Sequence, residues 1–410
     1  MNPKIRFKKE DGSSFDDYSM VKIGTLASKI QSGGTPKSSC KEYYDGDIKF
    51  LSISDMTKAG KYIKTTEKFL TEAGINNSSA WVVPKRSVLL SMYASYGKAC
   101  INEEEVATSQ AILAIIPANN NAEYLYQLLT HLQHDKFWDA YIKSGTQPNL
   151  SKAVIENTVV SVPELEEQQK IAAFFTALDE SIDICDKKLI LFEKIRDSIT
   201  NKLLTNAVSS SSKLHKGDEI SRVKIKEISE FVTVGIANAA RHAYCDCEEG
   251  IPLLRNMNIK ANKLDDSDLV YITHDFANKY KNKVLKENDI IVCRTGEPGT
   301  ACLVTKKFDG AQTFTTLIIR LKKDCCPEYV CRYMNSKEAK KYIESTTIGG
   351  GQKNSGAGII GEMPIDLPTI EVQKKIADVL LCVDNKVNVQ RSRLKCLKRL
   401  KRSIMQQMFV

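Results

Sequence analysis

Polar residues suited to binding nucleic acid occur in loops, several of them containing glycine, in both halves of this chain. Arginine and lysine can hold phosphate oxygens or guanine edges, asparagine and glutamine can pair with adenine, and glycine lets backbone N–H groups approach phosphates. The candidates in the first half are Thr35, Lys37, Ser91, Tyr93, Tyr96, Lys98, Gln147 and Asn149. Those in the second half are Arg255, Asn256, Arg294, Thr295, Gln352, Lys353 and Asn354. Loop residues are often polar only for solubility, so the paired placement of the two sets carries more weight than any single member.

Motifs of common enzymes are missing from the sequence. It contains no Gly-x-x-x-x-Gly-Lys-[Ser/Thr] phosphate loop, no Gly-x-Ser-x-Gly turn, no His-Glu-x-x-His and no glycine-rich dinucleotide fingerprint. The Asn/Asp-Pro-Pro-aromatic tetrapeptide of amino-methyltransferases is also absent, and the one Glu-x-Lys, Glu338-Ala339-Lys340, lacks the upstream Pro-Asp of a nuclease. We therefore expect no catalytic residues and no cofactor site on this chain.

Histidines and cysteines offer one arrangement that could bind a metal. His242, Cys245 and Cys247 lie close in sequence, and a fourth ligand would have to come from Cys325, Cys326 or Cys331. No Cys-x-x-Cys occurs, so we expect the twelve cysteines to be reduced thiols and the chain to hold no metal. His131 and His134 are expected to be surface residues of a helix.

An internal duplication organises the elements that must position these side chains. Eight residues recur at one fixed offset of 205, the separation of Pro163 from Pro368. Pro163, Glu166, Gln168, Lys170, Ile171, Ala172, Asp179 and Ile199 match Pro368, Glu371, Gln373, Lys375, Ile376, Ala377, Asp384 and Ile404.

Both copies of this repeat are predicted to be long helices. Proline stands at the start, acids follow in the first turns, and apolar residues recur with a period of 3.5, which is typical of a coiled-coil seam. One stripe is Ile171, Phe175, Leu178, Ile182, Cys185, Leu189, Phe192, Ile199 and Leu203, and the other is Ile376, Leu380, Val383, Val387, Leu394, Leu397, Ile404 and Met408. A base interrupts each stripe at equivalent positions, Arg196 and Lys401, which suggests that the seams face each other. The alternative is two unrelated amphipathic helices in separate domains.

A segment of about 150 residues precedes each helix, and the two segments match weakly in the same order. Residues 88–100 and 290–302 each predict a strand, a glycine-bearing turn and a second strand. Apolar strands follow at 111–116 and 316–321, and helices at 122–132 and 327–343. Short helical turns are expected at 26–30 and 228–231.

The predicted fold class is therefore α+β, with two mixed α/β domains separated by two long helices that form an antiparallel coiled coil within the chain and give it a pseudo-twofold repeat. We place the first domain at 1–161, the first helix at 162–207, a serine-containing linker at 208–220, the second domain at 221–366 and the second helix at 367–410.

Composition favours a polyanionic partner. The net charge is +9, and residues 391–402 contain seven bases and no acid, although such a run is often only a solvated helix face. No signal peptide and no run of eighteen apolar residues occurs, so we expect a cytoplasmic protein without a membrane partner.

The arrangement resembles the specificity (S) subunit of type I restriction-modification systems over essentially the whole chain. The helix openings Val162-Pro163-x-x-Glu166-x-Gln168-x-x-Ile171 and Leu367-Pro368-x-x-Glu371-x-Gln373-x-x-Ile376 are similar to that family's central repeats. Gly33-Gly34-Thr35-Pro36, followed by residues 47–56, is similar to the opening of its target recognition domains. The second domain departs from this opening, because Gly235-Ile236-Ala237-Asn238 replaces the first tetrapeptide.

The resemblance implies a non-catalytic subunit in which each domain reads one half of a bipartite, asymmetric site in double-stranded DNA and the helices set the gap. Two methyltransferase subunits with S-adenosylmethionine would pack on the helices, and two restriction subunits with ATP and Mg would join them. A coiled-coil scaffold with two interaction domains and no DNA specificity is the alternative, and a nuclease or fused methyltransferase is a second one.

Overall fold

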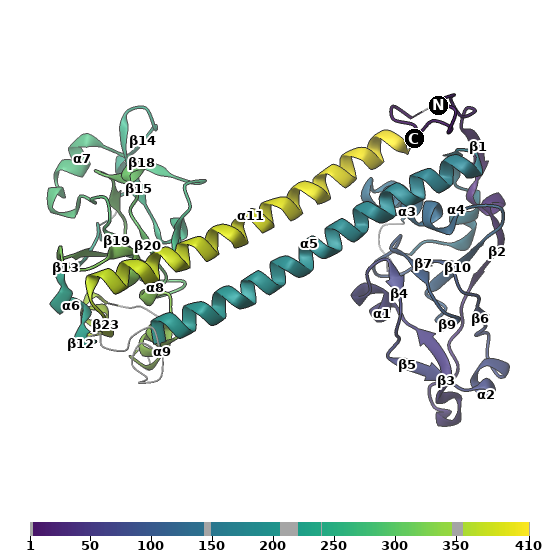
Figure 1. Ribbon diagram of the computed structural model, residues 1–410, viewed down its shortest axis with the longest axis horizontal. Helices are drawn as coiled ribbons and strands as arrows, with labels where there is room; N and C mark the ends of the chain where they lie inside the picture. The colour runs from purple at the N-terminus through teal and green to yellow at the C-terminus, as the bar shows by residue number, and fades with distance from the viewer. Residues whose placement is uncertain (1–2, 143–148, 206–219, 239, 347–355, 410) are drawn as a thin grey trace. The chain divides into compact units, whose positions relative to one another are not determined.

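The computed structural model describes residues 3–142, 149–205, 220–238, 240–346 and 356–409. The chain divides into two compact units, Met1–Lys187 with Arg391–Val410, and Lys188–Gln390. Each unit holds one α+β domain and one segment of each long helix, α5 (Leu165–Thr205) and α11 (Ile370–Met408) (Figure 1). The first unit therefore joins two separate stretches of sequence, whereas the second unit is one continuous stretch.

The first domain is built on two β-sheets. One has the order β2-β10-β7-β8-β4, the other β5-β3-β9-β6, and β1 pairs with β11 at the start of α5. Its strands are β1 (Ser19–Lys22), β2 (Ala27–Ser32), β3 (Tyr44–Leu51), β4 (Tyr62–Ile63), β5 (Lys68–Leu70), β6 (Val82–Val83), β7 (Val88–Ser91), β8 (Ala99–Asn102), β9 (Val106–Thr108), β10 (Ile112–Pro117) and β11 (Val159–Val162). Its helices and 3-10 turns are η1 (Ile23–Leu26), η2 (Lys41–Tyr43), α1 (Ile53–Lys58), α2 (Glu72–Asn76), α3 (Ala122–His134), η3 (Phe137–Tyr141) and α4 (Lys152–Asn157).

The second domain repeats this plan with sheets β13-β22-β19-β20 and β14-β18-β15-β21, and with β12 paired to β23. Its strands are β12 (Ser221–Lys224), β13 (Ser229–Val234), β14 (Tyr244–Cys245), β15 (Gly250–Leu254), β16 (Ile259–Lys260), β17 (Lys263–Leu264), β18 (Val270–Thr273), β19 (Ile290–Val292), β20 (Ala301–Leu303), β21 (Gln312–Thr313), β22 (Leu317–Leu321) and β23 (Pro364–Leu367). Its helices and turns are α6 (Ile225–Ile228), η4 (Arg241–Ala243), η5 (Asn256–Asn258), α7 (His274–Asn278), η6 (Lys281–Lys283), η7 (Lys306–Phe308), α8 (Pro327–Met334), α9 (Lys337–Thr346) and α10 (Ala357–Gly361).

Central strands of both domains follow from their apolar sequences. Every residue of β7 and of β19 is buried, and both strands pair antiparallel with their neighbours. The predicted strand, turn and strand at 88–100 and 290–302 are confirmed, and so are the strands after them. The α+β duplication is therefore visible strand by strand.

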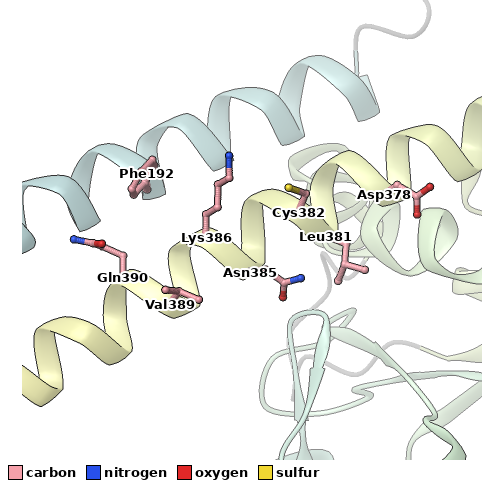
Figure 2. A pocket seen from close by; sticks show the side chains of 8 residues that line it. All are labelled: Phe192, Asp378, Leu381, Cys382, Asn385, Lys386, Val389 and Gln390. Atoms are coloured by element: carbon pink, nitrogen blue, oxygen red, sulfur yellow. The ribbon is translucent and has the colours of Figure 1, made fainter.

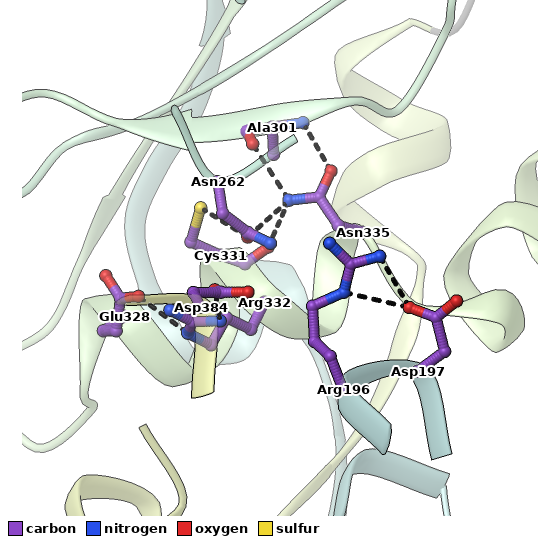
Figure 3. Close-up of polar contacts among 9 residues, drawn as sticks. All are labelled: Arg196, Asp197, Asn262, Ala301, Glu328, Cys331, Arg332, Asn335 and Asp384. Carbon is purple, nitrogen blue, oxygen red and sulfur yellow. Dashed lines mark hydrogen bonds and ion pairs between the residues drawn. The ribbon is translucent and has the colours of Figure 1, made fainter. Parts of the chain in front are cut away.

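Two local predictions were wrong. The short turns begin earlier than expected, at Ile23–Leu26 and Ile225–Ile228, and residues 27–32 and 229–234 are strands. Pairing with β10 and β22 outweighs the helix-like apolar spacing in those segments. The predicted helix at 327–343 is two helices, because the Asn335 side chain bonds Ala301 and the carbonyl of Cys331 between them (Figure 3).

In the first unit, α5 packs against the end of α11 through the predicted apolar seam. Phe175 is 0% exposed and stacks on Phe409, with ring centroids 5.8 Å apart. The carboxylate of Asp179 accepts hydrogen bonds from Lys401 Nζ (2.5 Å) and Gln127 Nε2 (2.7 Å). The base in the seam therefore pairs with an acid of the opposite helix.

In the second unit, Asp384 matches Asp179 but has a different partner. Arg332 occupies the place that Gln127 has in the first unit, and its side chain donates to Asp384 (2.6 Å) and Glu328 (2.7 Å) (Figure 3). Arg196 instead bonds the adjacent Asp197. Lys401 thus pairs with an acid of the opposite helix and Arg196 does not, because Arg332 already neutralises Asp384.

A buried glutamine ties the start of each long helix to its domain. Gln168, 3% exposed, donates from Nε2 to Pro163 O and Asn120 Oδ1 (both 3.0 Å) and accepts from Asn121 N (3.1 Å). Gln373 donates to Pro368 O (2.8 Å) and accepts from Cys326 N (2.8 Å). These bonds give the physical reason for the repeated Pro-x-x-Glu-x-Gln pattern.

No helix within the described ranges is long and apolar enough to cross a membrane.

Candidate nucleic-acid interface

Four loops of each domain are joined by hydrogen bonds, and we call them the loop cluster. They comprise residues 33–37, 52–54, 92–97 and 109–111 in the first domain, and 235–238, 255–257, 294–299 and 314–316 in the second. Gly34 N donates to Thr108 O (2.9 Å) and Ser109 N to Leu51 O (3.0 Å). In the second domain Ile236 N donates to Thr313 O and Phe314 N to Leu254 O (both 2.8 Å). The same framework therefore carries two different sets of side chains.

Glycines allow the first of these loops to lie against its neighbour. A Cβ at Gly33 would stand 1.9 Å from Thr108 O, and one at Gly34 would stand 2.2 Å from Ser79 Oγ. This close approach brings the Thr35 hydroxyl to Gln110, to which it donates a hydrogen bond. Lys37 follows on the exposed surface. In the second domain Gly235 keeps the close approach, whereas no threonine follows it.

The turn between the two buried strands has the same geometry in both domains. Gly97 N donates to Ser91 O (2.8 Å), and Gly299 N donates to Cys293 O (2.9 Å). Both glycines have a positive φ, +78° and +89°, and both have a side chain where a Cβ would stand. Glycine at these positions is therefore required by the turn itself.

Predicted site residues in the first turn divide into exposed and internal groups. Tyr93 is 36% exposed and forms a β-bridge with Asn149, which is also exposed. Ser91 is 1% exposed and its hydroxyl donates to Tyr93 O (2.8 Å). Lys98 Nζ donates to Thr57 O and Ala59 O at the end of α1. The structure thus uses Ser91 and Lys98 to hold the fold.

Tyr96 lies at the edge of the same turn. Its hydroxyl donates to Asp139 Oδ1 (2.9 Å), and this bond, with partial burial, raises the pKa of Tyr96. Its side chain also packs on the core of the first domain. A neutral phenol fixed in this way supports the turn.

In the second domain three of the predicted residues meet. Asn256 Nδ2 donates to Thr295 Oγ1 (3.1 Å), and Asn256 Oδ1 accepts from Arg294 N (3.0 Å). The Cys293 thiol donates to Asn256 O, and burial raises its pKa to about 11. Asn256 therefore fixes the start of the turn that carries Arg294 and Thr295.

Arg255 points elsewhere, since its guanidinium donates to the carbonyl (2.9 Å) and carboxylate (3.0 Å) of Asp268. Four further predicted residues lie outside the described part of the chain: Gln147, Gln352, Lys353 and Asn354.

Two residues of the loop clusters escaped the sequence analysis, Gln110 and Thr315. They occupy matching places in the β9–β10 and β21–β22 connections, and Thr315 has a φ of +56°. Asn256 Nδ2 lies 3.5 Å from the hydroxyl oxygen of Thr315. The offset of 205 relates the two positions, so the repeat itself could have identified them.

The metal and nuclease candidates were also placed by the structure. The described residues contain no group of three or more His, Cys, Asp or Glu side chains that could hold a metal ion. His242 packs edge-on against Phe276 instead. All twelve cysteines are free thiols. Glu338 and Lys340 lie on α9, two residues apart, and therefore point in different directions.

His131 differs from the expectation of a surface residue. Its side chain is 12% exposed and stacks on Phe409 with centroids 5.5 Å apart. Burial lowers its pKa, although the Asp135 carboxylate opposes the shift. His134 is exposed, as expected, and partial desolvation with Lys401 and Arg402 nearby lowers its pKa.

The long helices carry an open apolar surface in the second unit. A cavity of about 530 Å³ is bordered by Phe192 of α5 and by residues of α11 (Figure 2). The α11 residues are Asp378, Leu381, Cys382, Asn385, Lys386, Val389 and Gln390. Leu381 is 46% exposed and Val389 69%, which is unusual for side chains that a coiled coil could bury.

Known proteins similar to this chain agree with the geometry. The family model described as "Type I restriction modification DNA specificity domain" matches residues 16–193 and 218–399. The type I restriction enzyme MjaVIII specificity subunit of Methanocaldococcus jannaschii is 24% identical over 406 residues, which span 95% of this chain and 91% of the relative. The HindI specificity subunit of Haemophilus influenzae is 28% identical over 187 residues, 44% of this chain and 39% of the relative.

A solved structure supports the fold. The S subunit of a type I restriction-modification system from M. genitalium aligns with 100% of this chain and 99% of its own, with a TM-score of 0.63 and 13% identity. The family match favours DNA sequence recognition over a scaffold without DNA specificity. Because the two matched segments cover most of its length, the chain belongs to the family of type I restriction-modification DNA specificity domains.

Proposed function

We propose that this chain directs a type I restriction-modification complex to its target, each domain reading one half of a bipartite, asymmetric site in double-stranded DNA. One observation carries the proposal: a single backbone framework, the loop cluster, occurs twice and displays different side chains. The first copy displays Thr35, Gln110 and Tyr93, and the second copy displays Asn256, Thr315 and Thr295. Unlike side chains on like frameworks suit two unlike half-sites.

The geometry suggests how the candidate residues divide the work. Exposed Thr35, Lys37, Tyr93, Asn149 and Thr295 are in reach of a ligand at the loop clusters. We assign phosphate or base contacts to these residues together with Arg294. Ser91, Tyr96, Lys98, Arg255 and Asn256 position the loops through the bonds described above. Gln147, Gln352, Lys353 and Asn354 remain candidates for DNA contact.

Target recognition domains at 1–161 and 221–366 would be separated by helices at 162–207 and 367–410, with a linker at 208–220, and the helices would set the unread gap. The exposed apolar residues of the helices suit docking of two methyltransferase subunits, and two restriction subunits would complete the complex. S-adenosylmethionine, ATP and Mg would belong to those partners. This chain would itself be non-catalytic and act in the cytoplasm.

Methylation mapping tests the proposal. The chain is expressed with its methyltransferase subunit in a host that lacks the system, and methylated adenines are mapped across the genome. We expect a methylated motif of two short, unlike halves at one fixed spacing. Motif methylation that is absent, or that persists when this chain is omitted, contradicts the proposal.

A substitution in one loop cluster sharpens the test. Asn256→Ala removes the group that fixes Arg294 and Thr295, so it should relax selection in the half-site read by the second domain. Discrimination at the affected base pair should fall by about 1–3 kcal/mol, or roughly 5- to 150-fold. Asn282→Ala, at an exposed position of the same domain outside the loop cluster, serves as the control. Equal loss in both half-sites would indicate unfolding or a general weakening of binding.

A further inference from the structure

Five bases of α11 form one exposed face. At 100° per residue, Arg391, Lys395, Lys398, Arg399 and Arg402 fall within an arc of roughly 100° of the helix. We call these five residues the basic face. All five are exposed, and the buried seam residues Leu394 and Met408 lie outside the arc.

Helix stability does not account for the basic face. Three of its pairs stand four residues apart, Arg391 with Lys395, Lys395 with Arg399 and Lys398 with Arg402. Like charges at this spacing destabilise a helix by about 0.2–0.5 kcal/mol per pair. The last turn of α11, where bases would favour the helix dipole, contains none.

Internal ion pairs do not account for it either. Within the described residues, Lys395, Lys398, Arg399 and Arg402 form no ion pair with an acid of either helix or of the first domain. Lys401, the neighbouring base outside the arc, does so with Asp179. No acidic residue follows Asp384 in the sequence. The positive charge of Lys395, Lys398, Arg399 and Arg402 is therefore left for a partner.

The duplication shows that this partner is not one that binds both helices alike. At the offset of 205, the five bases correspond to Asp186, Ile190, Glu193, Lys194 and Asp197 of α5. Three acids, one base and an apolar residue thus replace five bases. Two identical methyltransferase subunits would need equivalent surfaces on both helices. The basic face occurs on α11 and has no counterpart on α5, which fits a single ligand such as one DNA duplex.

We infer that the basic face binds backbone phosphates of the unread DNA between the two half-sites. The inference rests on the proposed function, which supplies a continuous duplex running from one domain to the other. Charge complementarity selects DNA as the occupant, because four cations without an internal ion pair, gathered with Arg391 on one arc, match a row of phosphates. Such binding adds affinity and no sequence preference.

Salt dependence gives the expected magnitude. For each phosphate that the protein no longer neutralises, the slope of log affinity against log salt becomes shallower by about 0.9. If a variant of the basic face no longer neutralises two to four phosphates, its loss of DNA affinity between 50 and 200 mM salt should be smaller than that of the wild type by roughly 10- to 150-fold.

The test uses the full chain in complex with its methyltransferase subunit. The variant is K395Q/K398Q/R399Q/R402Q, in which glutamine keeps helix propensity; Arg391 stays because it also interacts within the protein. The control is K188Q/K194Q/K202Q/K374Q, which removes four exposed charges elsewhere on the same two helices. We expect a shallower salt slope for the variant only, with the methylated motif unchanged.

Duplexes with uncharged methylphosphonates in the spacer locate the binding surface on the DNA. They should bind the wild type and the control more weakly than natural DNA, while the variant should bind both duplexes equally. An unchanged salt slope in the variant, or equal losses on the modified duplex for variant and wild type, overturns the inference.

Two other outcomes are distinguishable. If the variant no longer assembles with the methyltransferase subunit, the basic face binds an acidic protein surface and the inference is wrong. If the wild type itself shows no site-specific binding or methylation, the proposed function has failed first. If the variant keeps the methylated motif and its salt slope equals that of the wild type, only the inference about the basic face is wrong.

Discussion

Replacing Gln168 by leucine should destabilise the first unit far more than the replacement of an exposed polar helix residue would. Gln168 is 3% exposed, and its amide makes three hydrogen bonds where α5 joins the first domain. Leucine has a similar volume, so the change removes the polar partners without opening a large space. The carbonyl of Pro163 would be left buried without its partner.

The magnitude follows from those three bonds. A buried polar group left without its partner costs about 1–3 kcal/mol. The bond to Pro163 O is fully buried and the other two are partly buried, so we expect a total of about 2–4 kcal/mol. In a unit of this size that corresponds to a fall in Tm of roughly 4–15 °C.

Thermal unfolding combined with hydrogen exchange measures the effect in the right unit. Gln168→Leu should speed exchange of the α3 amides, and Gln373→Leu should do the same for α8. Gln169→Leu, at the exposed neighbouring position, is the matched control. A Tm for Gln168→Leu equal to that of Gln169→Leu would refute the reasoning.

Other features of the fold make two further predictions. Desolvation lowers the pKa of His131 and of His134 in the folded chain below the ordinary value of 6.5. As the pH falls below about 6.5, the unfolded chain therefore binds more protons than the folded chain. The stability that these two histidines contribute is complete above that pH and is lost below it. The double variant His131→Gln/His134→Gln should therefore show a smaller drop in Tm between pH 7.5 and 5.5, and an undiminished drop would refute the assignment. Gly299→Ala should lower stability by about 2–4 kcal/mol, because a positive φ adds to a separation of only 2.1 Å between the new Cβ and the Ile343 side chain. Gly296→Ala, at φ +81° with open space around it, should cost only about 1–2 kcal/mol, and equal Tm changes for the two variants would show that the overlap with Ile343 does not matter.

Long-range repetition was the part of the fold most readable from the sequence. The offset of 205 and the 3.5-residue period predicted α5 and α11, because a coiled-coil seam leaves its period in the apolar residues. The glycine turns at Gly97 and Gly299 were predictable for a similar reason, since only glycine fits their backbone. The sequence did not distinguish helix from strand in residues 27–30, because pairing with β10 decides the conformation there.

The candidate site was less predictable because a sequence does not say where a side chain points. Ser91 and Lys98 stand in a polar turn and yet bond the protein interior. Gln110 was missed because its importance depends on Thr35, which is 75 residues away in sequence. Arg332 likewise gains its role only through Asp384, a residue of another helix.

The division of the first unit between distant parts of the chain has a consequence for synthesis. Met405, Met408 and Phe409 belong to the core of the first unit, whose other core residues end at Phe175. At about 5–20 residues per second, a ribosome needs roughly 10–45 s to make the intervening stretch. During that interval the nascent first unit exposes the apolar surface that α11 later covers. Chaperones are therefore expected to associate with the growing chain before the second domain is finished, and the first domain translated is the last to close.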